Sequence, residues 1–300
     1  MRTHPDCLPC FIRQALEGAR HVTKDEDLQE KVVREVLSLA ATCDADRPPP
    51  FMGGMIHATI RRLTGIADPY AEAKDICTRK ALDMYPGLEK QLLASPDRLE
   101  TGIRLAIAGN SMDFALNATV EDALVRNAID DSMSDDISGT VMEEFRRALA
   151  AAGEILYLAD NAGETVFDRL LLDQLPKDKI TYVVKGAPTI NDAVFVDAQR
   201  AGITDAVAVI DNGSDMPGTI LDTCSESFCR RFDAADMIIS KGQGNFESLS
   251  DVTKNIFFLF KAKCLPVSRR SGRDVGRTVF IKSTAVETPE KKKTYGRKAH

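Results

Sequence analysis

The stretch "EILYLADNAGETVFDRLLLDQL", residues 154–175, decides the fold. It begins as an apolar run typical of a buried strand, breaks at "DNAGE", and resumes with the apolar spacing of a helix. Asp160 and Asn161 stand side by side where the strand ends and the glycine turn begins. A strand, a polar turn and a helix in this order indicate one unit of an α/β sheet.

Four further runs are short, apolar and partly β-branched: "KITYVVKG" (179–186), "AVAVID" (206–211), "DMIISKG" (236–242) and "NIFFLFK" (255–261). Helical segments lie between several of them. Strands that are buried on both faces read as continuous apolar runs, so this alternation predicts a doubly wound, mostly parallel sheet. "RTVFIK" (277–282) adds an expected edge strand.

The first hundred residues have helical patterns instead. In residues 24–43 one helical face carries Leu28, Val32, Val36, Leu39 and Ala40, and "DRPPP" at 46–50 ends that helix. Further helices are expected at 55–65, 68–87, 95–110, 119–130 and 139–152. Pro86-Gly87 ends the helix at 68–87, and Ser95 caps the helix at 95–110. We therefore expect a helical N-terminal domain (1–100), an α/β domain (101–285) and a disordered basic tail (286–300).

Composition limits the function classes. The chain has 300 residues, a formal net charge of -6 and a pI of about 5.4, which argues against a nucleic-acid partner but allows a small anionic substrate. No apolar run reaches membrane-spanning length, and the N-terminus lacks a signal-peptide core. With seven cysteines, an odd number, we expect a cytoplasmic protein with reduced thiols. The oligomeric state is left open.

Polar side chains follow four of the predicted strands. They are Asp160 and Asn161 after the first, Lys185, Asn191, Asp192 and Asp197 after the second, Asp211, Asn212 and Asp215 after the third, and Lys241, Gly242, Gly244, Asn245 and Glu247 after the fourth. The carboxyl ends of parallel strands share one sheet edge, where ligands bind. Carboxylate and amide oxygens suit Mg²⁺ or Mn²⁺, and a lysine beside backbone N–H groups suits phosphate. Together they predict phosphoryl transfer or phosphoester hydrolysis.

Plainer interpretations stay open for single motifs. Asp160-Asn161 and "INDA" could cap helices, and "DNGSDMPG" resembles an ordinary turn. A P-loop, a dinucleotide-binding glycine motif and an Asp-x-Asp phosphatase motif are all missing, since the residue two after Asp160 is Ala162. None of the four histidines lies in the sheet half, which argues against a histidine-based zinc site there.

The motifs "LADNAGET", "GAPTINDA", "SKGQGNFE" and "AGNSMDF" together resemble the damage-control phosphatases, formerly domain of unknown function 89. The resemblance extends from "CLPC" to "KAKCLPV" (261–267), and "DPYAEAK" (68–74) fits the prokaryotic branch. It implies a helical N-terminal portion, a Rossmann-like α/β/α sandwich, and a divalent metal used to dephosphorylate small, often damaged, metabolites.

The same resemblance implies roles for individual residues. Asp160, Asn161 and Asp192 match the metal ligands, and Lys241 with Gly242 matches a phosphate-binding motif. The "GN..D" element falls on Gly109, Asn110 and Asp113, of which Asn110 and Asp113 are expected to bind substrate. Glu164 and Glu247 lie inside matched motifs without an assigned role.

Cys7 and Cys10 have the spacing of metal ligands or of a redox pair, or they could be two thiols buried as small apolar groups. A structural zinc site would need His4, Cys77 or another remote ligand. The resemblance does not choose among these three interpretations.

The leading hypothesis is a phosphatase that uses Mg²⁺, Mn²⁺, Co²⁺ or Ni²⁺ to hydrolyse small, phosphosugar-like metabolites. The nucleophile, an activated water or a carboxylate, and the natural substrate are not determined. One alternative is an S-adenosylmethionine-dependent carboxyl methyltransferase, although the first strand turn lacks a glycine-rich loop. The other is a non-catalytic module that binds phosphometabolites.

Overall fold

A six-stranded sheet forms the centre of the computed structural model, which describes residues 1–110, 122–137 and 139–283. Its order is β3-β2-β1-β4-β5-β6, with β1 to β5 parallel and β6 antiparallel at the edge. The strands are β1 (Ile155–Leu158), β2 (Ile180–Val184), β3 (Ala208–Asp211), β4 (Met237–Lys241), β5 (Ile256–Lys261) and β6 (Thr278–Lys282). The expected mostly parallel sheet with one added edge strand is confirmed.

Alternate residues of each central strand face different layers of helices. Ile155 and Tyr157 of β1 belong to one apolar core, and Leu156 and Leu158 belong to another on the opposite face. All residues of β1 and β4 are buried, which explains why these strands read as unbroken apolar runs.

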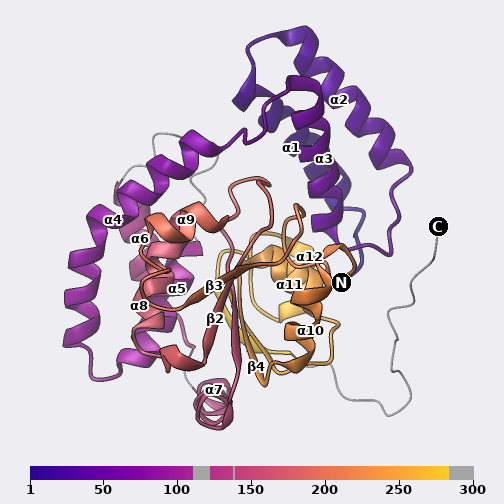
Figure 1. Cartoon of the computed structure of the whole chain (residues 1–300). Coiled ribbons are helices and arrows are strands. Elements are labelled where there is room, and N and C mark those ends of the chain that lie inside the picture. The colour runs from indigo at the N-terminus through magenta and orange to yellow at the C-terminus, as the bar shows by residue number, and fades with distance from the viewer. Residues whose placement is uncertain (111–121, 138, 284–300) are drawn as a thin grey trace.

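Helices cover both faces of the sheet (Figure 1). The larger core includes residues of α4 (Ala71–Ala94), α5 (Arg98–Asn110), α6 (Asp122–Ser134), α7 (Thr140–Ala151), α8 (Thr165–Leu172) and α9 (Phe195–Arg200). The other core includes residues of α10 (Glu226–Ala234), α11 (Gln243–Leu249) and α12 (Leu265–Ser271). Short 3₁₀ turns are η1 (Ala162–Glu164), η2 (Lys177–Lys179) and η3 (Leu221–Thr223). The result is an α/β/α sandwich.

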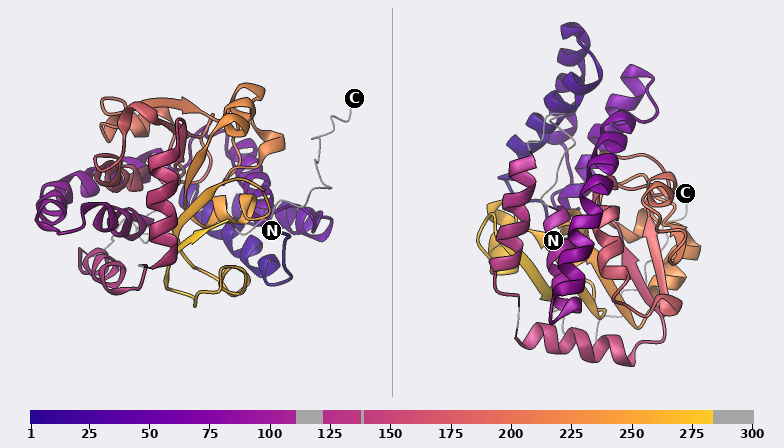
Figure 2. Two further views of the ribbon diagram at one scale, coloured as in Figure 1. Left: turned by 90° about the horizontal axis from the view of Figure 1, so that it is seen from below. Right: turned by 90° about the vertical axis from the view of Figure 1, so that its left-hand side faces the viewer.

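The first three helices form a separate unit, α1 (Cys7–Val22), α2 (Glu26–Ala41) and α3 (Pro49–Thr64). Its small core contains Val32 and Val36 from the predicted face of α2. Figures 1 and 2 show this unit beyond one end of the strands, on the opposite side of the sheet from α7. α4 and α5 pack into the core of the sheet and not into the core of the α1–α3 unit. The two cores therefore meet between α3 and α4, whereas we expected the boundary near residue 100.

Several helix boundaries differ from the sequence-based prediction, and three of them have a clear physical reason. α3 begins at Pro49 instead of near residue 55, since proline fits the first helical turn. α4 continues through Pro86 to Ala94, because burial of Leu88 and Leu92 outweighs the usual helix-breaking effect of proline. The side chain of Asp97, rather than Ser95, accepts a hydrogen bond from Glu100 N (3.0 Å) at the start of α5.

Among the described residues, no helix combines the length and apolarity that a membrane span requires. Two parts of the predictions, Asp113 and the basic tail (286–300), lie outside the described residues.

Candidate active site

The turn after β1 lies where the strand order reverses between β1 and β4, a place where α/β sheets bind ligands. Backbone hydrogen bonds join it to the loop after β2: Ala193 N donates to Asp160 O, and Ala162 N donates to Asn191 O, both at 2.8 Å. An isolated β-bridge pairs Asn161 with Asp192. The fold therefore brings Asp160, Asn161 and Asp192 together, as the sequence predicted.

Gly242 closes the other side of this turn. Its φ is +81°, and a Cβ added there would overlap the Asp160 carboxylate. Only glycine combines this backbone conformation with so close an approach. The "KG" motif thus presses its backbone against the side chain of Asp160.

Two amide side chains orient the carboxylates. Asn110 Nδ2 donates to Asp160 Oδ2 (2.8 Å) and to Glu164 Oε1 (2.7 Å). Asn161 Nδ2 donates to the same two atoms, which leaves its carbonyl oxygen as an acceptor for another partner. Asn110 Oδ1 already accepts from Lys261 N (3.1 Å), and Asn110 is fully buried. Asn110 therefore positions Asp160 and Glu164, in contrast to the substrate contact expected from the sequence.

Lys241 also differs from its expected role. Its side chain is 0% exposed, and Nζ lies 2.6 Å from Asp168 Oδ1 and 3.1 Å from Glu164 Oε2. Burial alone would lower the pKa of Lys241, but the charges of Asp168 and Glu164 outweigh it and hold the pKa above its usual value. The ammonium group neutralises two buried acids, so it cannot face a phosphate in this arrangement.

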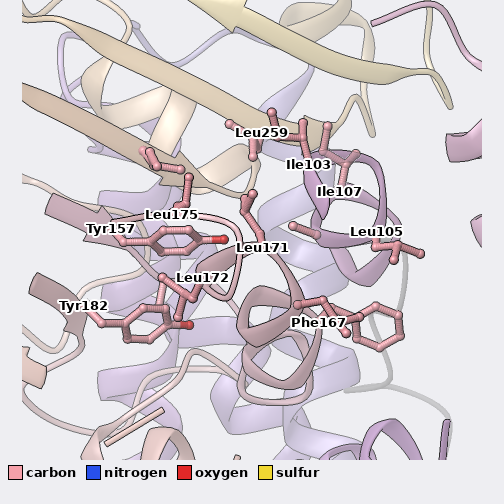
Figure 3. Packing of buried hydrophobic residues seen from close by; sticks show 14 of the residues in the cluster. Ile103, Leu105, Ile107, Tyr157, Phe167, Leu171, Leu172, Leu175, Tyr182 and Leu259 are labelled. Atoms are coloured by element: carbon pink, nitrogen blue, oxygen red, sulfur yellow. The ribbon is translucent and has the colours of Figure 1, made fainter. Parts of the chain in front are cut away.

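Asp168 was missed by the sequence analysis. Tyr157 Oη and Tyr182 Oη donate to its two oxygens at 2.8 and 2.7 Å. Figure 3 shows the two rings one above the other with their hydroxyls pointing the same way. The available signal was an acid inside the apolar helix "TVFDRLLL", four residues after Glu164, where a buried charge requires a partner.

A cavity of about 540 Å³ lies between the α1–α3 unit and this edge of the sheet. Asp160, Asn161 and Asp192 line it, whereas Lys241 and Asn110 do not. Arg13 of α1 and Lys263, which precedes α12, supply positive charge to its wall. The cavity thus has an acidic region at the strand ends and cationic side chains nearby.

The buried charges beneath the cavity do not balance. Four carboxylates, those of Asp160, Glu164, Asp168 and Asp192, adjoin two buried lysines, Lys241 and Lys185, the latter 3.4 Å from Asp192. With all four carboxyl groups ionised, the excess would be two negative charges. Burial, followed by the charges of Glu164 and Asp192, raises the pKa of Asp160 well above its usual value.

This donor set fits a divalent cation, because two carboxylates and an amide oxygen are hard ligands and the cation would cancel the excess charge. In residues 1–110, 122–137 and 139–283, no three His, Cys, Asp or Glu side chains converge as a preformed metal site. The proposed ligands Asp160, Asn161 and Asp192 are not a group of that kind, because one of the three is the amide oxygen of Asn161.

Cys7 and Cys10 lie in the first turn of α1 and line the same cavity, together with Cys264. Burial raises the pKa of the Cys7 thiol to about 11 and also raises that of Cys264. His4 lies 3.3 Å from Asp6, and Cys77 lies against Gly163. For Cys7 and Cys264 these surroundings favour protonated thiols packed as small groups, whereas Cys10 is exposed.

Comparison with known proteins identifies the family. The family described as "Damage-control phosphatase ARMT1-like domain" matches residues 3–279. The chain belongs to this damage-control phosphatase family.

Relatives and a solved structure agree with that assignment. The chain is 32% identical to a protein named damage-control phosphatase from Archaeoglobus fulgidus, over 93% of this chain and 98% of the relative. It is 33% identical to a protein of that name from Pyrococcus horikoshii, over 94% and 99%. A crystal structure of a member of domain of unknown function 89 from Pyrococcus horikoshii superposes with a TM-score of 0.85 at 29% identity, over 94% and 99% of the two chains. The resemblance suggested by the motifs is confirmed.

Proposed function

We propose that this protein is a divalent-metal-dependent phosphatase that hydrolyses small phosphorylated metabolites. The observation that carries the proposal is the cluster of four buried carboxyl groups with only two lysines beneath the cavity. Membership of the damage-control phosphatase family supports the reaction class, since two relatives carry that name.

Asp160, Asn161 and Asp192 would hold the cation, which we expect to be Mg²⁺, Mn²⁺, Co²⁺ or Ni²⁺. When bound, the cation would polarise a phosphoryl group and lower the pKa of a water molecule. Asn110 and Asn161 keep the Asp160 carboxylate in one orientation, and Gly242 prevents it from moving toward β4. The chain thus holds its ligand oxygens in place before the cation arrives.

Lys263 and Arg13 are the cationic side chains on the cavity wall, so they replace Lys241 as the proposed contacts for the phosphate oxygens. Lys263 is close enough to lower the pKa of the Asp160 carboxyl. A phosphate bound between the cation on the acidic floor and the side chains of Lys263 and Arg13 would face positive charge on both sides.

The organic part of the substrate would lie against α1 and α3. Gln14 of α1 and Tyr70, which precedes α4, carry polar groups on the cavity wall, while Phe11 of α1 and Ile190, in the loop after β2, are apolar. A cavity of about 540 Å³ suits a molecule of sugar-phosphate size.

The test is hydrolysis of p-nitrophenyl phosphate and a panel of sugar phosphates, with each of the four divalent ions added to chelator-treated protein. The wild type should hydrolyse at least one ester in a metal-dependent way. Asp160→Ala should reduce kcat by at least about 10³-fold with an unchanged circular-dichroism spectrum. Asp211→Ala serves as the control, because Asp211 ends β3 at the same sheet edge but does not line the cavity, and its side chain accepts a hydrogen bond from Gly213 N. Full phosphatase activity in Asp160→Ala would contradict the assignment of Asp160 to the active site.

A further inference from the structure

Glu247 is a further acidic side chain of the cavity that is not among the proposed metal ligands. It lies on α11 and lines the same cavity as Asp160, Asn161 and Asp192, with 8% of its surface exposed. α11 begins directly after Gly242, whose backbone touches Asp160. One short, buried helix therefore fixes the position of Glu247 relative to the cluster.

The Glu247 carboxyl group is held in one orientation. Gln243 Nε2 donates to Glu247 Oε1 at 3.0 Å, and Gln243 Oε1 accepts from Lys263 N at 2.8 Å. Because both ends of the Gln243 amide are used, its nitrogen must face Glu247. This leaves the other carboxyl oxygen, Oε2, for a group in the cavity.

The surroundings of Glu247 favour a proton on it near neutral pH. Burial raises its pKa to about 7, against the opposing effects of Gln243, the N-terminal amino group and Lys263. The thiols that face it, Cys7 and Cys264, have raised pKa values and stay neutral. A carboxyl group that titrates near pH 7 is suited to donate a proton in a reaction at that pH.

Asp160 and Glu247 thus have different environments within one cavity. Asp160 lies among Glu164, Asp192 and amide donors, an arrangement suited to a cation. Glu247 faces an amide, the N-terminal amino group, a lysine and thiols. Two carboxyl groups with such different surroundings can take separate roles in one reaction. Lys263 lowers the pKa of both, so it lies within electrostatic reach of each.

We propose that Glu247 is the general acid that protonates the leaving-group oxygen of the phosphoester, an inference that rests on the proposed phosphatase function. The ester P–O bond breaks with its electron pair on the leaving oxygen. That oxygen takes the proton of Glu247 and becomes a hydroxyl group. Water supplies the new P–O bond, and the resulting dihydrogen phosphate returns a proton to the carboxylate.

The substrate class follows from this role. A general acid is needed when the leaving group is a poor one, as with the alkoxide of a sugar or another alcohol, and is dispensable for a stable phenolate. The cavity is therefore built for alkyl phosphates rather than for aryl phosphates or acyl phosphates.

The experiment compares Glu247→Gln with wild type on two esters, glycerol phosphate and p-nitrophenyl phosphate, in the same metal-loaded protein. Glutamine keeps the shape of the side chain and cannot donate the proton as an acid. We expect kcat for glycerol phosphate to fall by at least about 100-fold, and kcat for p-nitrophenyl phosphate to change less than about threefold. Glu226→Gln, an exposed position on α10, should change neither.

Equal losses for the two esters would overturn the assignment while leaving the phosphatase intact, because a structural role would affect both. Absence of hydrolysis of both esters by the wild type would overturn the proposed function and this assignment with it. If Glu247→Gln does not fold, the pH profile of the wild type decides. kcat for glycerol phosphate should fall as pH rises through the pKa of Glu247, whereas kcat for p-nitrophenyl phosphate should not. Identical profiles would overturn the assignment.

Discussion

At the scale of single residues, the candidate site depends on how closely the chain can approach the Asp160 carboxylate. Asn110 comes from the end of α5, Gly242 directly follows β4, and Asn161 is the next residue after Asp160. Each contact removes one direction in which the carboxylate could move. The carboxylate is therefore oriented by the fold itself, before any ligand binds.

Gly242→Ala tests this crowding. The new Cβ would overlap Asp160, so we expect a loss of stability larger by at least about 2 kcal/mol than at a glycine without neighbours. The matched control is Gly276→Ala, where φ is +86° and no atom lies within 4 Å of the added Cβ. The free energy of unfolding of Gly276→Ala should fall only by the cost of placing alanine at positive φ, about 1–2 kcal/mol.

Urea denaturation of both variants measures the difference in free energy of unfolding. Equal losses at the two positions would show that the backbone conformation alone matters, and that the contact between Gly242 and Asp160 does not.

At the scale of secondary-structure elements, β4 and α8 are joined beneath the site by buried charges. Lys241 at the end of β4 pairs with Glu164 and with Asp168 of α8. Tyr157 and Tyr182, from β1 and β2, complete the hydrogen bonds of Asp168. Since burial and Asp168 raise the pKa of both tyrosines, they stay protonated and keep donating. Three strands and a helix thus converge on one carboxylate.

Lys241→Met would leave Glu164 and Asp168 without their cation, and we expect a loss of stability of about 3–5 kcal/mol. Adding Asp168→Asn to Lys241→Met removes one of the uncompensated charges and should restore part of that loss. The measurement is the midpoint of thermal unfolding without added metal. A phosphate-binding lysine would instead give a normal unfolding temperature and a raised KM, which would contradict the buried ion-pair role.

The sequence predicted the elements of the sheet better than it predicted the contacts between side chains. The strands were evident because burial on both faces makes them continuously apolar, as in "IFFLFK" of β5. Pro86 misled the prediction for α4, because local propensity does not include the burial of Leu88 and Leu92.

The same limit applies to the candidate site. Asp160, Asn161 and Asp192 could be grouped from the sequence, because the ends of parallel strands share an edge. The roles of Lys241 and Asn110 could not be predicted, since their partners Asp168 and Glu164 are fixed only by packing between distant elements. In the sequence, a lysine that binds phosphate looks the same as a lysine in a buried ion pair.

At the scale of the whole molecule, the cavity has walls from two units with separate cores. Arg61 of α3 donates to Asp215 Oδ2 (2.7 Å) and to Pro188 O (3.0 Å) in loops beyond β3 and β2. Arg47 donates to Asp222 across the same junction. The α1–α3 unit is therefore attached directly over the strand ends, where it encloses the acidic floor of the cavity.

The central claim is that this floor holds a divalent cation on Asp160, Asn161 and Asp192, and calorimetric titration of Mn²⁺ into chelator-treated protein tests it most directly. Asp192→Asn should weaken binding by more than about tenfold. Asp197→Asn is the control, because Asp197 is likewise buried and paired with a lysine (Lys74, 3.2 Å) but does not line the cavity. Asp197→Asn should bind Mn²⁺ as the wild type does. Unchanged Mn²⁺ affinity in Asp192→Asn would contradict the account.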